Sequence, residues 1–153
     1  MNITIYEAGL NDCERVYPLV CELASGGRTG GGGKYRPSFE KYAKTYKLLL
    51  SDKGKKYFVA KDGADIAGVA GLAINQSLVE SGSFAFIEEL VVGEKYRRNG
   101  VGQKLLDACI AFAGERECQS IVLTSGNERY AAHKLYEKNG FEKVGVKYAI
   151  DFT

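Results

Sequence analysis

Apolar and polar positions recur with two periods along the chain, and these periods predict the order of its strands and helices. Alternation or a short apolar run predicts five strands, at residues 3–7, 56–61, 64–74, 83–92 and 120–124. Apolar residues spaced three or four apart predict four amphipathic helices, around residues 16–23 and at 38–50, 101–116 and 129–138. Residues 141–152 are expected to supply one or two last strands.

The order of these elements indicates the fold class. Strands that alternate with helices are typical of an α/β (α+β) domain in which helices cover a mixed sheet. The dipeptide Asp62-Gly63 between two predicted strands indicates a tight hairpin. No linker or internal repeat interrupts the 153 residues, which is a common length for one domain. We therefore predict a single domain over residues 1–153.

A glycine-rich segment at residues 26–33 raises the question of nucleotide binding. Six of its eight residues are glycine, and Gly33-Lys34 resembles the end of a phosphate-binding loop. That motif requires glycine five positions before its Gly-Lys pair, but Arg28 stands there, and Tyr35 replaces its Ser or Thr. We therefore expect a flexible loop here rather than a phosphate site.

The balance of charges counts against two classes of partner. The 21 basic side chains face 19 acidic ones, which leaves a formal net charge of +2. This balance gives no overall field to hold nucleic acid or an anionic lipid surface, and we expect neither as a partner. The chain shows no secretory signal pattern and no apolar stretch near the roughly 18 residues of a membrane span. We therefore expect a cytoplasmic protein.

Cysteine and histidine are too sparse for an ordinary zinc site. The four cysteines show no Cys-x-x-Cys spacing, and the chain has one histidine. We therefore predict no metal site. Cys13 and Cys109 fall on helical patterns with apolar neighbours, which indicates buried thiols.

The stretch at residues 87–106 carries the strongest chemical signal. A predicted strand ends there, a basic turn with Gly100 and Gly102 follows, and an amphipathic helix begins at once. The first turn of a helix has unpaired backbone N–H groups and a partial positive charge near +0.5. Glycines allow close approach to this backbone, and three cationic side chains add charge beside it: Arg97, Arg98 and Lys104. These features together favour a diphosphate ligand over a plain turn.

Two motifs in this order resemble one enzyme family. Arg97-x-x-Gly100-x-Gly102, preceded by Glu89-Leu90-Val91-Val92, is similar to the acyl-CoA signature of the GCN5-related N-acetyltransferases (GNAT). Residues 132–141, which include a tyrosine and end in Gly-Phe, resemble the second motif of that family. The resemblance covers the whole chain and implies a GNAT-type mixed, mostly antiparallel sheet flanked by helices. It also implies acetyl-CoA as the cofactor, with CoA as product.

Within that family, residues 16–23 and Ala132-His133 are most similar to the aminoalkylphosphonate and small-amine acetyltransferase group. The function implied is acetyl transfer to a primary amine of a small molecule, by a monomer or homodimer. Three alternatives stay open: a silent acyl-CoA-binding sensor or interaction module, a protein or peptide N-acetyltransferase, and a nucleotide or nucleic-acid binder. The near-neutral charge counts against the last.

The resemblance also implies which residues hold the cofactor. Backbone groups of Leu90 and Val92, with Val91 between them, would align the acetyl-pantetheine arm like an added strand. The diphosphate would lie on the turn and first helical residues: Arg97, Arg98, Asn99, Gly100, Val101, Gly102, Gln103 and Lys104. Many family members have an asparagine seven residues before the tyrosine. Here Arg129 holds that position and Asn127 lies two residues earlier, so both are candidates for a contact with CoA.

Two glutamates and a tyrosine are the candidate catalytic groups. Glu88 and Glu89 are candidate general bases for the protonated amine, acting directly or through water. Strand alternation predicts that they lie on opposite faces, and resemblance to polyamine-acetylating members slightly favours Glu88. Tyr136 is the expected donor to the CoA sulfur. The structural alternatives are solvated or salt-bridged glutamates and an ordinary core tyrosine; His133 is interpreted mainly as a core or capping residue.

The acceptor site is expected beside the glycine-rich loop and the helix that follows it. Four residues are candidates to line it: Tyr35, Arg36, Tyr42 and Tyr46. Arg28 or Arg36 is a candidate to recognise an acidic group on the acceptor.

Overall fold

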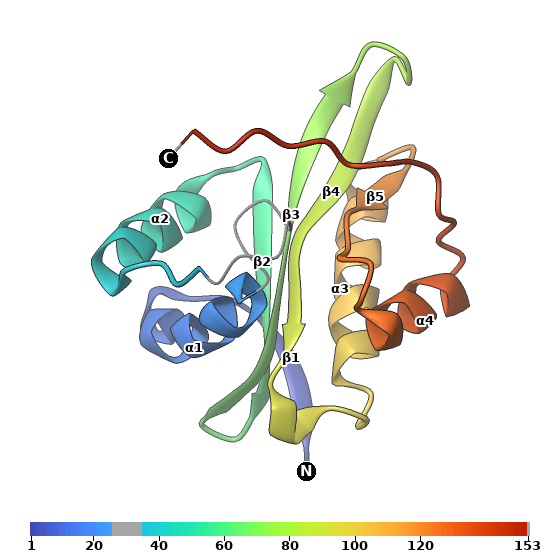
Figure 1. Cartoon of the computed structure of the whole chain (residues 1–153). Coiled ribbons are helices and arrows are strands. Elements are labelled where there is room, and N and C mark those ends of the chain that lie inside the picture. Colours follow the sequence, from blue (N-terminus) through green and yellow to red (C-terminus); the bar gives the residue numbers. More distant parts are fainter. Residues whose placement is uncertain (26–34, 153) are drawn as a thin grey trace.

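The computed structural model describes residues 1–25 and 35–152 and shows a five-stranded sheet between helices (Figure 1). The strands are β1 (Ile3–Glu7), β2 (Lys55–Asp62), β3 (Asp65–Ser77), β4 (Gly82–Val92) and β5 (Ile121–Leu123). They lie in the order β1-β2-β3-β4-β5; the first three pairs are antiparallel and β4–β5 is parallel. The predicted mixed, mostly antiparallel sheet of an α/β domain is therefore confirmed. The glycine-rich loop at residues 26–33, with Arg28, lies outside the described residues.

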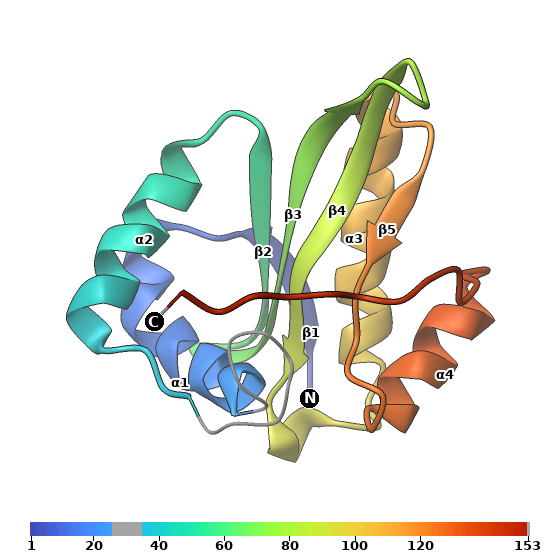
Figure 2. The same ribbon diagram turned by 45° about the horizontal axis from the view of Figure 1, so that its top comes forward.

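Helices cover both faces of this sheet. The elements α1 (Cys13–Ala24) and α2 (Phe39–Ser51) lie on one face, and α3 (Val101–Glu115) lies on the other. The view in Figure 2 shows α4 (Tyr130–Lys138) beside β5, at the far edge from β1. Short 3-10 turns precede two of the helices: η1 (Leu10–Asp12) and η2 (Glu94–Tyr96). No helix in the described residues is both long and apolar enough to cross a bilayer.

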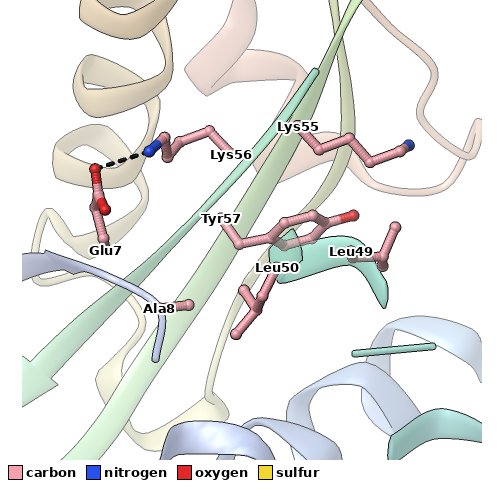
Figure 3. Close-up of a pocket in the computed structure, with 7 residues that line it drawn as sticks. All are labelled: Glu7, Ala8, Leu49, Leu50, Lys55, Lys56 and Tyr57. Atoms are coloured by element: carbon pink, nitrogen blue, oxygen red, sulfur yellow. Dashed lines mark hydrogen bonds and ion pairs between the residues drawn. The ribbon is translucent and has the colours of Figure 1, made fainter. Parts of the chain in front are cut away.

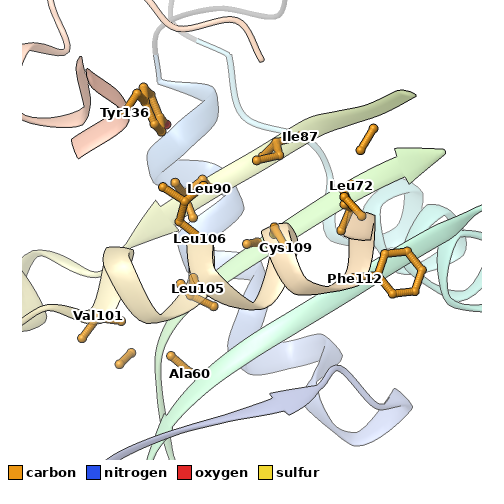
Figure 4. Close-up of a cluster of buried hydrophobic side chains, with 14 of the residues drawn as sticks. Ala60, Leu72, Ile87, Leu90, Val101, Leu105, Leu106, Cys109, Phe112 and Tyr136 are labelled. Atoms are coloured by element: carbon orange, nitrogen blue, oxygen red, sulfur yellow. The ribbon is translucent and has the colours of Figure 1, made fainter. Parts of the chain in front are cut away.

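The core on the α3 face fixes that helix against the strands (Figure 4). Leu105, Leu106 and Cys109 are fully buried, as the helical pattern predicted for the cysteine. Burial of a leucine side chain stabilises a fold by about 1.5–3 kcal/mol. Gly68 of β3 makes the close approach possible, because a Cβ there would lie 2.9 Å from Cδ1 of Leu105 and 2.9 Å from the carbonyl oxygen of Val91. The position of the α3 N-terminus is therefore fixed by tight packing.

The prediction of strands at residues 141–152 is wrong. In the structure this segment has no regular secondary structure and runs across the strands instead of along a strand edge (Figure 1; Figure 2). A strand needs a neighbouring strand that satisfies its backbone groups. This segment follows α4 and pairs with none of the five strands of the sheet. Five apolar residues on it are 79–93% exposed: Val144, Val146, Tyr148, Ile150 and Phe152.

Candidate active site

The outer edge of β4 opens halfway along the strand. β5 pairs with β4 from Ala85 to Ile87 and then ends, while β4 continues to Val92. The N–H of Gly93 donates to the carbonyl oxygen of Ala67 in β3. Because backbone groups alternate in direction along a strand, those of Leu90 and Val92 face away from β3, toward the open edge. This is the pair of residues that sequence resemblance assigns to the pantetheine arm.

The open edge leads to the N-terminus of α3. Gly100 precedes this helix with φ 76°, ψ 9°, a left-handed conformation that glycine adopts without strain. Glycine has no side chain to cap the helix, and the first turn of this fully described helix contains no acidic residue. Asn99 shapes the turn by donating to the carbonyl oxygens of Tyr96 and Arg97. The first N–H groups of α3 are therefore left available for an anion.

Two of the three cationic side chains predicted to surround this anion, Arg97 and Lys104, form contacts within the fold. The Arg97 guanidinium donates to the carbonyl oxygen of Val92 at 3.1 Å and forms an ion pair with Glu22. The Lys104 ammonium donates to the carbonyl oxygen of Ile3 at 3.0 Å. These contacts join α3 and its preceding turn to α1 and β1, so the open part of the predicted phosphate site is its backbone together with the exposed Arg98.

Gln103 and Gly102 likewise hold the fold together. The Gln103 amide exchanges hydrogen bonds of 2.8 and 2.9 Å with Asn139 at the end of α4. A Cβ on Gly102 would lie 3.2 Å from Cδ2 of Leu135 and 3.7 Å from Cγ2 of Val92. Glycine at position 102 therefore allows α4 and β4 to approach the first turn of α3, besides leaving its backbone accessible.

A β-bulge in β4 changes the expected geometry of the two glutamates. Gly71 pairs with Glu89 and Leu72 pairs with Ile87, so Glu88 is an extra residue without a register partner. An extra residue interrupts the alternation of side chains. The expectation that Glu88 and Glu89 lie on opposite faces is therefore wrong. Their partners confirm this arrangement, because both contact side chains from the same face of β2.

Those partners are Lys55 and Tyr57, which alternation places on one face of β2. The Lys55 ammonium contacts Oε1 of Glu88 at 2.5 Å, and the Tyr57 hydroxyl donates to Oε2 of Glu89 at 3.1 Å. Burial, followed by repulsion from Glu88, raises the pKa of Glu89 to about 7, although Tyr57 and Lys55 oppose the shift. Glu89 is therefore poised to exchange a proton near neutral pH. The sequence analysis did not predict a role for Lys55 or Tyr57. The signal that could have indicated one is Gly71, because an isolated glycine inside a strand often marks a place where another group approaches the backbone closely.

Tyr136 lies on the other side of the open edge. It is buried in the α3-side core, as Figure 4 shows, and burial raises the pKa of its hydroxyl while Arg129 lowers it in part. Arg129 donates to the carbonyl oxygen of Leu90 at 3.4 Å, whereas Asn127 is exposed in the loop before α4. A ring nitrogen of His133 lies 2.9 Å from the carbonyl oxygen of Gly126, a contact within the β5–α4 connection.

A family comparison fits this arrangement. Residues 21–141 match the acetyltransferase (GNAT) family. The chain belongs to this family. Human N-alpha-acetyltransferase 30 is 32% identical over 99 residues, which are 63% of this chain and 26% of that protein. This GNAT chain spans at most about half the length of the curated relatives it matches.

Solved structures agree on the fold over the full chain. A protein from Bacillus halodurans described as a transcriptional regulator superposes with TM-score 0.84 and 26% identity, covering 99% of this GNAT chain and 100% of its own. AAC(6')-Iy, in complex with the bisubstrate analogue CoA-S-monomethyl-acetylneamine, has TM-score 0.82 and 18% identity over 100% of both chains. These structures support the fold, and the family supports the predicted class, an acetyl-CoA-dependent acyltransferase. They do not identify an aminoalkylphosphonate subgroup.

Two tyrosines predicted to line the acceptor pocket belong to the core of this GNAT domain. Tyr42 and Tyr46 are buried, and their hydroxyls donate to the carbonyl oxygens of Cys13 and Gly9, each at 2.7 Å. They hold α2 against α1 and the preceding turn, so the prediction for them is wrong. Arg36 remains on the surface, with its guanidinium 5.5 Å from the centre of the Tyr17 ring.

A small pocket lies near β2 and the end of α2. Its volume is about 50 Å³, and seven residues line it: Glu7, Ala8, Leu49, Leu50, Lys55, Lys56 and Tyr57. Figure 3 shows Lys55 and Tyr57 pointing away from Lys56, which forms an ion pair with Glu7. This volume suits a few water molecules rather than an amine substrate.

Proposed function

We propose that the chain transfers an acetyl group from acetyl-CoA to a primary amine of a small molecule. The observation that carries this proposal is the open edge of β4, which runs from Glu88 and Glu89 to the uncapped N-terminus of α3. An extended amide-containing arm with a diphosphate at its end is complementary to such an edge, because the outward N–H groups of the strand precede the free N–H groups of the helix. The carbonyl oxygens of Leu90 and Val92 on the same edge accept from Arg129 and Arg97.

The residues that would hold the cofactor follow from this edge. Backbone N–H groups of Leu90 and Val92 donate to the pantetheine amides, and N–H groups of residues 101–103 donate to the diphosphate. Acetyl-CoA when bound supplies an electrophilic thioester carbonyl and a thiolate leaving group. An N–H of β4 beside that carbonyl stabilises negative charge on its oxygen as the amine attacks.

Glu89 is the better candidate for the general base. A free amine with a pKa near 10 is mostly protonated at pH 7, so a group must accept its proton before attack. Glu89, with a pKa raised to about 7, combines a useful fraction of carboxylate with enough basicity at neutral pH. Glu88 forms an ion pair with Lys55, which places a competing cation on its carboxylate. We therefore assign proton acceptance to Glu89, directly or through water.

Tyr136 is the proposed donor to the leaving sulfur. Burial raises the pKa of its hydroxyl, which favours hydrogen-bond donation over complete proton transfer. Arg129 joins α4 to the carbonyl oxygen of Leu90, so it connects the helix that carries Tyr136 with the edge of β4.

A peptide N-terminus is the second candidate acceptor, because the matched human relative is an N-alpha-acetyltransferase. A panel of amines separates the two: small primary amines, aminoalkylphosphonates, polyamines, aminoglycosides and peptides with free N-termini. CoA release, followed with a thiol reagent from pH 6 to 9, should occur with at least one small amine. Release with peptides alone would favour the second candidate. Acetyl-CoA binding without release on the whole panel would instead indicate a silent sensor.

Glu89→Gln is the variant that tests the mechanism. It keeps the size of the side chain but cannot accept the proton, so turnover should fall by about 10²- to 10⁴-fold. Glu7→Gln, an exposed position on β1, is the matched control and should keep full activity. Size-exclusion chromatography of the same samples will show whether the active species is a monomer or a homodimer.

A further inference from the structure

We propose that Tyr57 is a positioning residue that holds the Glu89 carboxylate where it accepts the proton of the amine. The proposal rests on the proposed function and adds to it a residue from β2. Its basis is the geometry of three neighbouring strands around the bulge of β4.

Tyr57, Gly71 and Glu89 form one row across the sheet. Tyr57 pairs in register with Gly71, and Gly71 pairs with Glu89. The tyrosine is therefore two strands away from the glutamate, too far for side chains that stand upright on the sheet. Its hydroxyl nevertheless reaches Oε2 of Glu89 at 3.1 Å, because the ring lies flat across β3.

Gly71 makes this path possible. A Cβ built on Gly71 would lie 2.1 Å from Cε1, 2.5 Å from Cδ1 and 2.6 Å from Cζ of the Tyr57 ring. Real Cβ atoms do not approach other atoms so closely, so any other residue at position 71 would displace the ring. The glycine therefore has a definite physical role, which is to leave room above β3 for the aromatic ring.

The hydroxyl of Tyr57 is a dependable donor. Burial, together with the charge of Glu89, raises the pKa of this hydroxyl above its ordinary value, so the phenol keeps its proton throughout the working range. A hydrogen bond to a carboxylate favours the charged form of the acid. Tyr57 thus orients one oxygen of Glu89 and limits the rise in its pKa that burial causes.

A purely structural role is less consistent with the contacts. Tyr42 and Tyr46 are core tyrosines here, and their hydroxyls end on backbone carbonyl oxygens. The Tyr57 hydroxyl donates instead to the carboxylate of Glu89, the candidate base. The other charged groups that act on this pair are Glu88 on β4, Lys55 on β2 and Asp52 after α2, and none of them is altered by a change at Tyr57.

Tyr57→Phe is the direct test, with the full chain and acetyl-CoA. Loss of the donor should shift the acid limb of the plot of kcat/KM against pH to higher pH, by about 0.5 to 1 unit, because Glu89 then holds its proton more tightly. At pH 7, kcat should fall about 3- to 30-fold while the KM for acetyl-CoA stays within twofold. Tyr46→Phe removes a buried hydroxyl on α2, and should lower the melting temperature without moving the profile.

Gly71→Ala and a direct titration complete the test. Gly71→Ala displaces the ring, so adding Tyr57→Phe to it should cause no further shift in the profile. Carboxyl-carbon NMR of Glu89 in the wild-type and Tyr57→Phe chains reports the same pKa change even if no amine is turned over. An unmoved Glu89 titration in folded Tyr57→Phe overturns the proposal, whereas absence of turnover with a shifted titration counts against the proposed function alone.

Discussion

The pKa of Glu89 has a consequence for folding that is independent of any substrate. In the unfolded chain this carboxyl has an ordinary pKa of 4.5, and in the folded protein burial and the charge of Glu88 raise it to about 7. The folded protein therefore binds the proton more tightly. The stability that this gives is fully present below pH 4.5 and is lost as the pH rises through 7.

The size of this loss follows from the pKa difference. Each unit is worth about 1.36 kcal/mol, so the folded protein should lose about 3 kcal/mol through this group between pH 4.5 and 8. Glu89→Gln has no charge to gain. We therefore expect it to resemble the wild type in stability at pH 4.5 and to exceed it by about 2–3 kcal/mol at pH 8.

Urea unfolding of both chains, measured by circular dichroism every half unit from pH 4.5 to 8.5, tests this expectation. The difference in the free energy of unfolding should rise between pH 4.5 and 7 and then level off. Glu7→Gln is the control, and as an exposed change it should alter stability by no more than about 0.5 kcal/mol at any pH. A difference between wild type and Glu89→Gln that does not vary with pH would refute the raised pKa, and with it the reason for choosing Glu89 as the base.

Four further substitutions test other parts of the site and fold. Tyr136→Phe should lower kcat at least tenfold and leave the Kd for acetyl-CoA, measured by calorimetry, within threefold; unchanged turnover would make it a core tyrosine. Lys104→Met should cost about 1 kcal/mol in urea, because it removes the bond to Ile3, and should leave the Kd within twofold; a tenfold weaker Kd would place its ammonium on the diphosphate. Val146→Ser and Ile150→Ser, at 80% and 79% exposed positions, should each change stability by less than about 0.5 kcal/mol. A loss of more than 2 kcal/mol in the free energy of unfolding would instead indicate that these side chains are buried, as in the strand predicted there.

The fold was predictable wherever local pattern and tertiary packing agree. The strand over residues 83–92 and the helix over 101–116 are close to β4 and α3 as observed, because their apolar residues face a real core. The strands predicted at residues 141–152 do not form, and the reason is the opposite one. The residues of this segment favour an extended chain, but whether an extended chain pairs depends on which edge it meets, and that edge is set by α4 and the short β5.

The backbone geometry of the candidate cofactor site was predictable from the sequence, but the contacts of its side chains were not. Glycines and a helix start are local features, so the open turn before α3 follows from residues 97–102 alone. The directions of Arg97 and Lys104 are not local. They depend on Glu22 in α1 and the carbonyl oxygen of Ile3 in β1, and no spacing within the motif indicates these partners.

The two glutamates show how one extra residue in a strand brings together side chains that regular alternation would separate. In a regular strand, Glu88 and Glu89 would face opposite sides, and neither would perturb the other. The bulge opposite Gly71 places both carboxylates toward β2, where burial and mutual repulsion disfavour the charge on Glu89. Lys55 forms an ion pair with Glu88. The Tyr57 ring lies across the bare backbone of Gly71, and its hydroxyl donates to Glu89. A carboxyl group that titrates near neutral pH therefore depends both on the bulge of β4 and on the absence of a side chain at Gly71 of β3.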